Sequence, residues 1–202
     1  KETNHLPLER GTVITTVVSS DLGSLLCQDY GLFTRRTLTG FKYIGEQIEL
    51  IEKSREAHFI FGYEESGGYL AAPFVRDKDG VMGVLLVCQM AAHYYGQGKT
   101  LIRVLEDIYK KYGYFSEKLI SLSNPKEIEQ IMKLMEQWRK LMPFTIARYN
   151  IIHVEDYLHG NTGLPPENAI KITLDNQSWI CVRPSGTEPK VKIYICARAR
   201  SA

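Results

Sequence analysis

The sequence has no excess of charge of either sign and no long uninterrupted apolar run. Its 25 basic and 23 acidic residues leave a formal net charge of +2, so no broad positive field attracts nucleic acid. The longest apolar run, residues 81–92, is broken by Gln89 and is shorter than the ~20 residues of a membrane-spanning helix. We therefore expect neither a nucleic-acid partner nor a membrane partner.

Closely spaced cysteines are also lacking. The four cysteines, at positions 27, 88, 181 and 196, lie in apolar segments and form no Cys-x-x-Cys pair, which argues against a zinc site and a disulfide framework. The five histidines show no metal-ligand spacing. A reduced, cytoplasmic setting is expected. The chain starts at Lys1 without an initiator Met or a signal peptide, which suggests a piece of a longer protein.

The first part of the chain alternates β-branched apolar segments with amphipathic ones. The pattern predicts strands at 12–18, 33–38 and 57–61 and helices at 22–30, 43–54, 82–95 and 100–112. Residues 82–95 are apolar nearly all round, so that helix is expected to be buried. This alternation predicts an α/β fold, with a doubly wound α/β/α domain and a mixed sheet over residues 1–122.

The second part, residues 123–202, combines one helix with several strands. Asn124 followed by Pro125 and Glu127 is a strong helix start. That helix is expected to reach about residue 141, with an apolar stripe made of Ile128, Ile131, Met132, Met135 and Trp138. Strands are predicted at 145–154, 169–174, 178–182 and 191–197. We expect a small α+β domain in which one helix packs on an antiparallel sheet.

The segment Arg183-Pro-Ser-Gly-Thr-Glu-Pro-Lys190 has the composition of a phosphate-binding loop. Ser185, Gly186 and Thr187 can turn successive backbone N–H groups into one concavity. Arg183 adds a planar fork that matches phosphate oxygens, and Lys190 and Lys192 add positive charge. A polar hairpin turn is the alternative.

The segment Gly62-Tyr-Glu-Glu-Ser-Gly-Gly-Tyr69 follows the third predicted strand of the first domain, where open α/β sheets bind ligands. Glu64 and Ser66 could accept and donate hydrogen bonds to neighbouring sugar hydroxyls, although a solvated turn would need no ligand. In Arg76-Asp-Lys-Asp-Gly80, Lys78 could meet a phosphate. Two carboxylates there could suggest a divalent metal, but a salt-bridged helix cap is favoured.

The segment Gly96-Gln-Gly-Lys-Thr100 imitates the end of a nucleotide-binding P-loop. His93 replaces the first glycine of that motif, and the segment follows a helix instead of a strand. A turn between two helices is therefore preferred over an ATP site.

Three segments, in order, resemble the α-D-phosphohexomutase family of phosphoglucomutases and phosphomannomutases. They are Thr39-Gly-Phe-Lys-Tyr-Ile44, Tyr63-Glu-Glu-Ser-Gly-Gly-Tyr-Leu70 with the Arg76–Gly80 turn, and the Arg183–Lys190 segment. The resemblance covers nearly the whole chain and corresponds to the family's third and fourth domains. It implies an intramolecular phosphotransferase that interconverts hexose 1-phosphate and hexose 6-phosphate through a phosphoserine, with Mg²⁺ and a hexose 1,6-bisphosphate activator.

The resemblance also implies roles for individual residues. Glu64, Ser66, Lys78, Thr39, Gly40 and Phe41 would contact the sugar, and Arg183, Ser185, Gly186, Thr187 and Lys192 would hold the phosphate that does not react. The family's phosphoserine loop and metal loop have no counterpart here, and neither does its final helix. The chain would therefore hold no catalytic residue or metal ligand, would depend on the enzyme's own N-terminal domains, and would be inactive alone. A phosphopentomutase and a free-standing sugar-phosphate-binding module remain alternatives.

Overall fold

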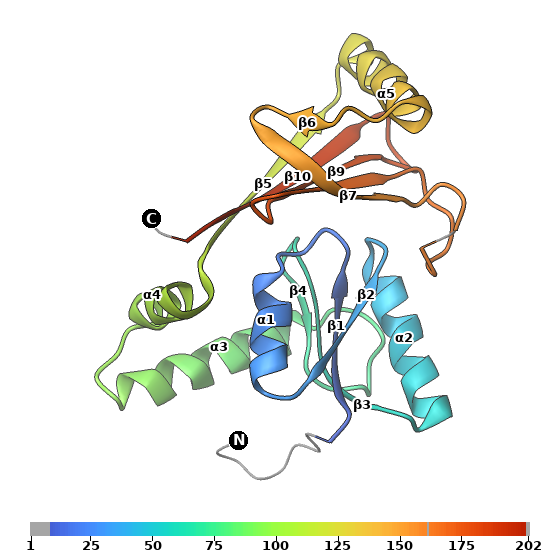
Figure 1. Ribbon diagram of the computed structural model, residues 1–202. Helices are drawn as coiled ribbons and strands as arrows, with labels where there is room; N and C mark the ends of the chain where they lie inside the picture. Colours follow the sequence, from blue (N-terminus) through green and yellow to red (C-terminus); the bar gives the residue numbers. More distant parts are fainter. Residues whose placement is uncertain (1–8, 161, 201–202) are drawn as a thin grey trace. The chain divides into compact units, whose positions relative to one another are not determined.

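The computed structural model describes residues 9–160 and 162–200, and the chain divides into two compact units, Lys1–Tyr112 and Gly113–Ala202 (Figure 1). The sequence placed the domain boundary after residue 122. The difference comes from Tyr114–Leu122 (β5), a strand that the sequence did not predict. β5 pairs along its whole length with a strand near the end of the chain, so it belongs to the second unit.

The first unit is built around a four-stranded mixed sheet. Its strands are β1 (Gly11–Thr16), β2 (Phe33–Thr37), β3 (His58–Glu64) and β4 (Gly68–Leu70), in the order β2-β1-β3-β4. β1 runs parallel to β2 and β3, and β4 returns antiparallel to β3. Its helices are α1 (Leu22–Asp29), α2 (Phe41–Ser54), α3 (Gly80–Tyr95) and α4 (Leu101–Tyr112). The predicted mixed α/β architecture is confirmed.

Helices α1 and α2 cover opposite faces of this sheet, as two neighbouring residues of β3 show. A Cβ atom at Gly62 would lie 2.8 Å from Ile44 of α2. A Cβ atom at Gly23 of α1 would lie 2.0 Å from the hydroxyl of Tyr63. Since consecutive strand residues point to opposite faces, the two helices pack on opposite sides. Glycine at 23 and 62 allows both close approaches.

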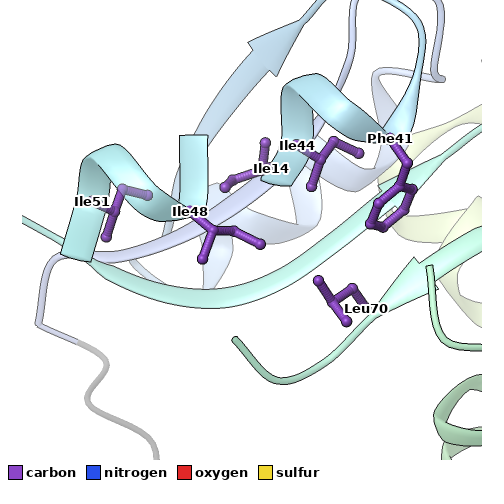
Figure 2. Packing of buried hydrophobic residues seen from close by; sticks show 6 residues of the cluster. All are labelled: Ile14, Phe41, Ile44, Ile48, Ile51 and Leu70. Carbon is purple, nitrogen blue, oxygen red and sulfur yellow. The ribbon is translucent and has the colours of Figure 1, made fainter. Parts of the chain in front are cut away.

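The core between α2 and the sheet contains the apolar stripe that the sequence predicted. Ile44, Ile48 and Ile51 of α2 are buried against Ile14 of β1 and Leu70 of β4 (Figure 2). Phe41, the first residue of α2, completes the cluster. The packing of this stripe fixes the position of the N-terminus of α2. The Thr39–Phe41 segment, which was predicted to contact the sugar, lies at that end of the helix.

Helix α3 departs from expectation. The sequence predicted a buried helix, but none of the residues of α3 is buried in the structure. Val81 and Tyr95 are 83% and 84% exposed. The helix contacts β4 and α4 within its own unit, and those contacts leave most of its surface open.

The second unit is one helix on an antiparallel sheet, as predicted. Its elements are β5, α5 (Pro125–Lys140), β6 (Thr145–Ile146), β7 (Tyr149–Asp156), β8 (Ile170–Leu174), β9 (Trp179–Pro184) and β10 (Val191–Ala199). The strand order is β5-β10-β9-β8-β7-β6. The single strand predicted at 145–154 is two strands, because the chain turns at Ala147, whose φ is 53°.

Helix α5 begins where the sequence predicted. The side chain of Asn124 accepts a hydrogen bond of 3.0 Å from the backbone N–H of Lys126, and Pro125 occupies the first turn. Met135 is buried among residues of β8, β9 and β10. The rest of the predicted stripe packs around the same cluster: Ile128, Ile131, Met132 and Trp138.

Candidate functional site

The predicted sugar-binding residues of the first unit gather at one edge of its sheet. The parallel strands β1, β2 and β3 end at Thr16, Thr37 and Glu64. Thr39 and Gly40 follow β2 directly. The carboxyl ends of parallel strands are where open α/β sheets bind ligands. The topology therefore brings segments that are far apart in the sequence to the same edge.

Glu64 is the last residue of β3, whereas the sequence placed it in an extended loop. Only residues 65–67 separate it from β4. Its side chain is 10% exposed, and its Oε1 lies 3.8 Å from the Nζ of Lys78. Gly68 is its partner across the hairpin, and a Cβ there would lie 2.8 Å from Oε1. Glycine at 68 therefore leaves room for the Glu64 carboxylate.

Lys78 lies near both Glu64 and Phe41, two other residues that were predicted to contact the sugar. Its Nζ lies 5.9 Å from the ring centroid of Phe41, within range of a cation–π contact, and its side chain is 56% exposed. Phe41 itself is only 3% exposed, because its ring belongs to the core under α2. The Lys78 ammonium group thus lies over the buried ring of Phe41. Because the Lys78 side chain is exposed, this group is accessible to a ligand.

The turn that carries Lys78 is held in place from both ends. Asp79 caps α3 by accepting a hydrogen bond of 3.0 Å from the N–H of Met82. Arg76 forms an ion pair with Glu52 of α2. The carbonyl oxygen of Arg76 approaches α2 at Gly45, where a Cβ would lie 2.5 Å from it. These contacts agree with the capped turn that the sequence favoured over a metal site, although Arg76 pairs outside the turn.

Ser66 lies exposed in the hairpin turn, next to a network that the sequence analysis missed. Its neighbour Glu65 accepts a hydrogen bond of 2.8 Å from the hydroxyl of Thr16. Thr16 and Ser19 share a further hydrogen bond of 2.9 Å between their hydroxyls. This network ties the β3–β4 turn to the end of β1. The available signal was a hydroxyl residue at the end of a buried strand, Thr16, with Ser19 three residues later.

Thr39 and Gly40 form the entry to α2. Gly40 has φ 117°, a backbone conformation that favours glycine, and it occupies the N-cap position without a side-chain cap. The hydroxyl of Thr39 is buried and has no hydrogen-bond partner among the residues that the structure describes. A buried hydroxyl without a partner is costly to the fold.

In the second unit, Arg183 is fixed by its neighbours near the end of β9. Its Nε forms an ion pair with Glu167, and both side chains are less than one-fifth exposed. Burial works against the charge of Arg183, but hydrogen bonds and electrostatic attraction from Glu167 and Tyr194 outweigh it and raise its pKa. The guanidinium is therefore a permanent cation held in one orientation.

Lys192 lies directly opposite Arg183 in the β9–β10 pair. Their sequence neighbours Val182 and Ile193 pack in the core beneath α5. Since neighbouring strand residues point to opposite faces, Arg183 and Lys192 share the face that α5 does not cover. Two predicted phosphate-binding cations are thus brought side by side.

The loop that follows Arg183 turns its backbone N–H groups toward one oxygen. The hydroxyl of Ser185 accepts from the backbone N–H groups of Thr187 and Glu188, at 3.4 and 3.3 Å. The N–H of Ser185 donates to the carbonyl of Lys190, which closes the loop at 2.8 Å. Gly186 and Thr187 are exposed at its tip. Both N–H groups are thus occupied by the Ser185 hydroxyl, as in a polar turn, and the phosphate site stays a prediction.

A pocket of about 580 Å³ in the second unit lies away from this loop. Its lining includes Tyr114, Trp179 and Ala199, which stand at the beginning of β5, the beginning of β9 and the end of β10. The predicted phosphate-binding loop, residues 185–190, joins the opposite ends of β9 and β10. The pocket is therefore not part of the predicted phosphate site.

Two other predictions concern metal ions and nucleotides. The described part of the chain contains no group of three or more His, Cys, Asp or Glu side chains that could hold a metal ion. The Gly96–Thr100 segment joins α3 to α4 as a turn, and Lys99 pairs with Asp107 at 3.0 Å.

Within residues 9–160 and 162–200, every helix is too short or too polar to cross a bilayer.

Both units of the chain match models of one known protein family. Residues 1–112 match the family model described as phosphoglucomutase/phosphomannomutase, alpha/beta/alpha domain III. Residues 117–202 match the C-terminal domain of the same family. A phosphoglucomutase from Staphylococcus epidermidis is 38% identical over 96% of this chain, and one from Staphylococcus aureus is 35% identical. The chain spans 37% of the length of each of these relatives.

Solved structures share the fold at lower identity. A putative phosphomannomutase from Thermus thermophilus matches 95% of this chain and 33% of its own length, with a TM-score of 0.63 and 19% identity. The open form of the phosphoglucomutase pp63/parafusin from Paramecium matches 94% of this chain and 34% of its own length, with a TM-score of 0.68 and 16% identity. Both likenesses concern the fold.

Proposed function

The chain belongs to the phosphoglucomutase/phosphomannomutase family, and we propose that it is the part of a phosphohexomutase that recognises the sugar and holds the phosphate that does not react. The whole enzyme would interconvert hexose 1-phosphate and hexose 6-phosphate. The observation that carries this proposal is the contact of Glu64 with Lys78, 3.8 Å apart at the carboxyl edge of a parallel sheet.

Glu64 and Lys78 together suit a phosphosugar. An ionised carboxylate can accept hydrogen bonds from two neighbouring sugar hydroxyls, and an ammonium group can donate to a hydroxyl or a phosphate oxygen. Thr39 lies at the same edge, where its buried hydroxyl has no hydrogen-bond partner within residues 9–160 and 162–200. Ser66 adds an exposed hydroxyl at the neighbouring turn. The donors and acceptors of this edge therefore match a polyhydroxyl ligand better than an apolar one.

The phosphate site would consist of Arg183, Lys192 and the loop of Ser185, Gly186 and Thr187. Because Arg183 and Lys192 are cross-strand partners, they can contact the same anion. A mutase that passes through a bisphosphorylated intermediate must bind it in two orientations. Binding energy from the phosphate that does not react can hold the ligand in either orientation.

The phosphoryl transfer itself would depend on other parts of a longer protein. By family resemblance those parts would carry the phosphoserine and the ligands of Mg²⁺, which would stabilise charge on the transferring phosphoryl group. A hexose 1,6-bisphosphate activator and a cytoplasmic location belong to the same proposal. The groups of this chain would act by binding and orienting the substrate.

An activity assay in two backgrounds tests the proposal. The 202-residue chain, mixed with glucose 1-phosphate, Mg²⁺ and glucose 1,6-bisphosphate, is expected to form no glucose 6-phosphate. The longer protein encoded by the same gene is expected to form it. Calorimetry should nevertheless detect binding of glucose 6-phosphate to the 202-residue chain.

Three results would change the assignment. Turnover by the 202-residue chain would contradict its proposed dependence on other domains. A gene that encodes only these residues would favour a free-standing binding module. Faster turnover of ribose 1-phosphate than of glucose 1-phosphate would move the protein to the phosphopentomutases.

A further inference from the structure

Helix α3 combines a composition typical of a buried helix with an exposed position. Residues Gly80–Tyr95 include no Asp, Glu, Lys or Arg, and a helix without a charged face is expected to be covered on all sides. Val81, Val84 and Tyr95 are nevertheless 83%, 65% and 84% exposed. Along the same helix, Leu85, Val87 and Met90 are also exposed.

Helix α4, which contacts α3, also exposes apolar residues. Ile102 is 73% exposed and Leu105 is 43% exposed. Unlike α3, however, α4 is an ordinary amphipathic helix, with ion pairs such as Arg103 to Glu106 at 2.9 Å on its surface. The absence of Asp, Glu, Lys and Arg is therefore a feature of α3, and α4 contributes individual exposed apolar residues.

We propose that the exposed apolar surface of α3, with Ile102 and Leu105 of α4, is the interface on which the remaining domains of the longer mutase pack. This proposal rests on the proposed function, because it requires that such domains exist. The relatives that match this chain at 35–38% identity extend well beyond it, since the chain spans only 37% of their length. The matched family models are a third domain and a C-terminal domain, and the occupant to which this proposal commits is the domains that precede them.

The chemistry of the surface indicates a permanent partner. Interfaces that form and dissociate resemble ordinary protein surface, whereas obligate interfaces are more apolar and poor in charge. The sixteen residues of α3 have no charged side chain at all. A surface of this kind would aggregate if it were regularly uncovered. A domain on the same polypeptide covers it continuously, and a second copy of the chain would do so only at sufficient concentration.

A substitution compared in two backgrounds tests this interface. Val84→Glu places a charge on an exposed position of α3, and glutamate is a good helix former, so α3 itself should tolerate it. Leu50→Glu is the matched control, since Leu50 is a 48% exposed apolar residue of α2 in the same unit. Melting is followed by circular dichroism at 222 nm in the 202-residue chain and in the longer protein.

The expected result is a difference between backgrounds. Val84→Glu should leave the melting temperature of the 202-residue chain unchanged and lower that of the longer protein by about 3–8 °C. Leu50→Glu should change neither. Equal destabilisation by Val84→Glu in both backgrounds would show that α3 packs within the 202-residue chain and would overturn the proposal. No effect in either background would overturn it as well.

Chemical labelling gives an independent measurement at the same surface. Cys88 of α3 is exposed, whereas Cys27, Cys181 and Cys196 are buried. A thiol reagent should therefore modify Cys88 rapidly in the 202-residue chain and at least tenfold more slowly in the longer protein. Equal rates would contradict the proposed interface.

Two further outcomes separate the alternatives. If the 202-residue chain forms a dimer that Val84→Glu dissociates, the occupant is a second copy and the proposal is wrong. If the longer protein lacks mutase activity but shows the expected melting and labelling differences, the proposed function fails and the interface stands. The two proposals can thus fail separately.

Discussion

Arg183 and Glu167 form an ion pair in which the Nε of the guanidinium contacts the carboxylate, and only 19% and 18% of the two side chains are exposed. Glu167 is itself held by its backbone, whose N–H donates to the carbonyl of Tyr157 at 2.9 Å. An arginine fixed through Nε loses less rotational freedom when its terminal NH₂ groups bind a phosphate. Glu167 is thus expected to position Arg183.

The first prediction concerns this pair. Arg183→Ala should weaken binding of glucose 6-phosphate by roughly 1.5–3 kcal/mol, the range for hydrogen bonds to charged groups. Glu167→Ala should weaken it about tenfold, since Arg183 then loses its fixed orientation, which corresponds to about 1.4 kcal/mol. Glu167→Gln keeps an acceptor for Nε and should restore most of the affinity. Isothermal titration calorimetry measures all three.

A double-mutant cycle distinguishes positioning from a general structural role. If Glu167 acts through Arg183, Glu167→Ala should have no further effect on affinity in a chain that already carries Arg183→Ala. An additive loss would assign Glu167 another role. Tighter phosphate binding in Glu167→Ala would show that this carboxylate competes with the ligand, which contradicts the prediction.

The second prediction concerns Lys78. Lys78→Ala removes the ammonium group that lies 3.8 Å from Glu64 and should weaken binding of glucose 6-phosphate about tenfold. Lys53→Ala is the matched control, because Lys53 is an exposed lysine of the same unit that pairs with Glu49 on α2. Calorimetry of the 202-residue chain measures both. Equal affinities for the two variants would remove Lys78 from the site.

The third prediction concerns Gly45, which lets the turn of Lys78 approach α2. Gly45→Ala would place a Cβ 2.5 Å from the carbonyl oxygen of Arg76, so either the turn or the helix must shift. Overpacking of this kind costs about 1–3 kcal/mol, more than the gain in helix propensity. Thermal melting by circular dichroism measures the loss, and the affinity for glucose 6-phosphate should fall with it.

Gly80→Ala is the control for Gly45. Gly80 is also a helical glycine, at the beginning of α3, but a Cβ there would meet no atom within 4 Å. This variant is expected to be neutral or slightly stabilising, since alanine restricts the unfolded chain more than glycine does. A Gly45→Ala variant as stable as Gly80→Ala would show that the approach of Arg76 is not tight.

The sequence predicted those features whose causes are local. The start of α5 follows from Asn124 and Pro125, which lie next to each other and cap the helix directly. The stripe of α2 follows from the spacing of Ile44, Ile48 and Ile51. The anion site around Arg183 also rests on local composition, and it stays a prediction.

The missed features depend on residues that are distant in the sequence. β5 alternates polar and apolar residues only weakly, and its pairing with β10 joins the two ends of the second unit. Glu167 and Arg183 are brought together by the sheet, so no local motif revealed their contact. The predicted burial of α3 was wrong, because burial depends on the neighbours that the fold supplies, and none of the residues of α3 is buried.

The fourth prediction is a pH dependence of the second unit. Arg139 of α5 donates two hydrogen bonds, of 2.9 and 3.2 Å, to the carboxylate of Asp156 at the end of β7. Partial burial raises the pKa of Asp156, but the hydrogen bonds from Arg139 and from the backbone of Leu158 outweigh it, and the pKa is lowered overall. The folded state therefore favours the ionised carboxylate.

The sign of the effect follows from this lowered pKa. The stabilisation is fully present above the ordinary aspartate pKa of about 3.9 and is lost as the pH falls through the lower pKa of the folded state. Asp156→Asn should thus destabilise the second unit by about 1–3 kcal/mol at pH 7. The difference from the unsubstituted chain should shrink progressively below about pH 4.

Urea denaturation followed by tryptophan fluorescence measures this difference, because both tryptophans, Trp138 and Trp179, lie in the second unit. Glu129→Gln is the control: Glu129 also pairs with a cation on α5, Lys133 at 2.7 Å, but its side chain is 65% exposed. Exposed pairs contribute at most about 1 kcal/mol, so this variant should change stability little at any pH. A pH-independent loss in Asp156→Asn would mean that the ion pair with Arg139 does not stabilise the fold, and that the substitution acts through packing alone.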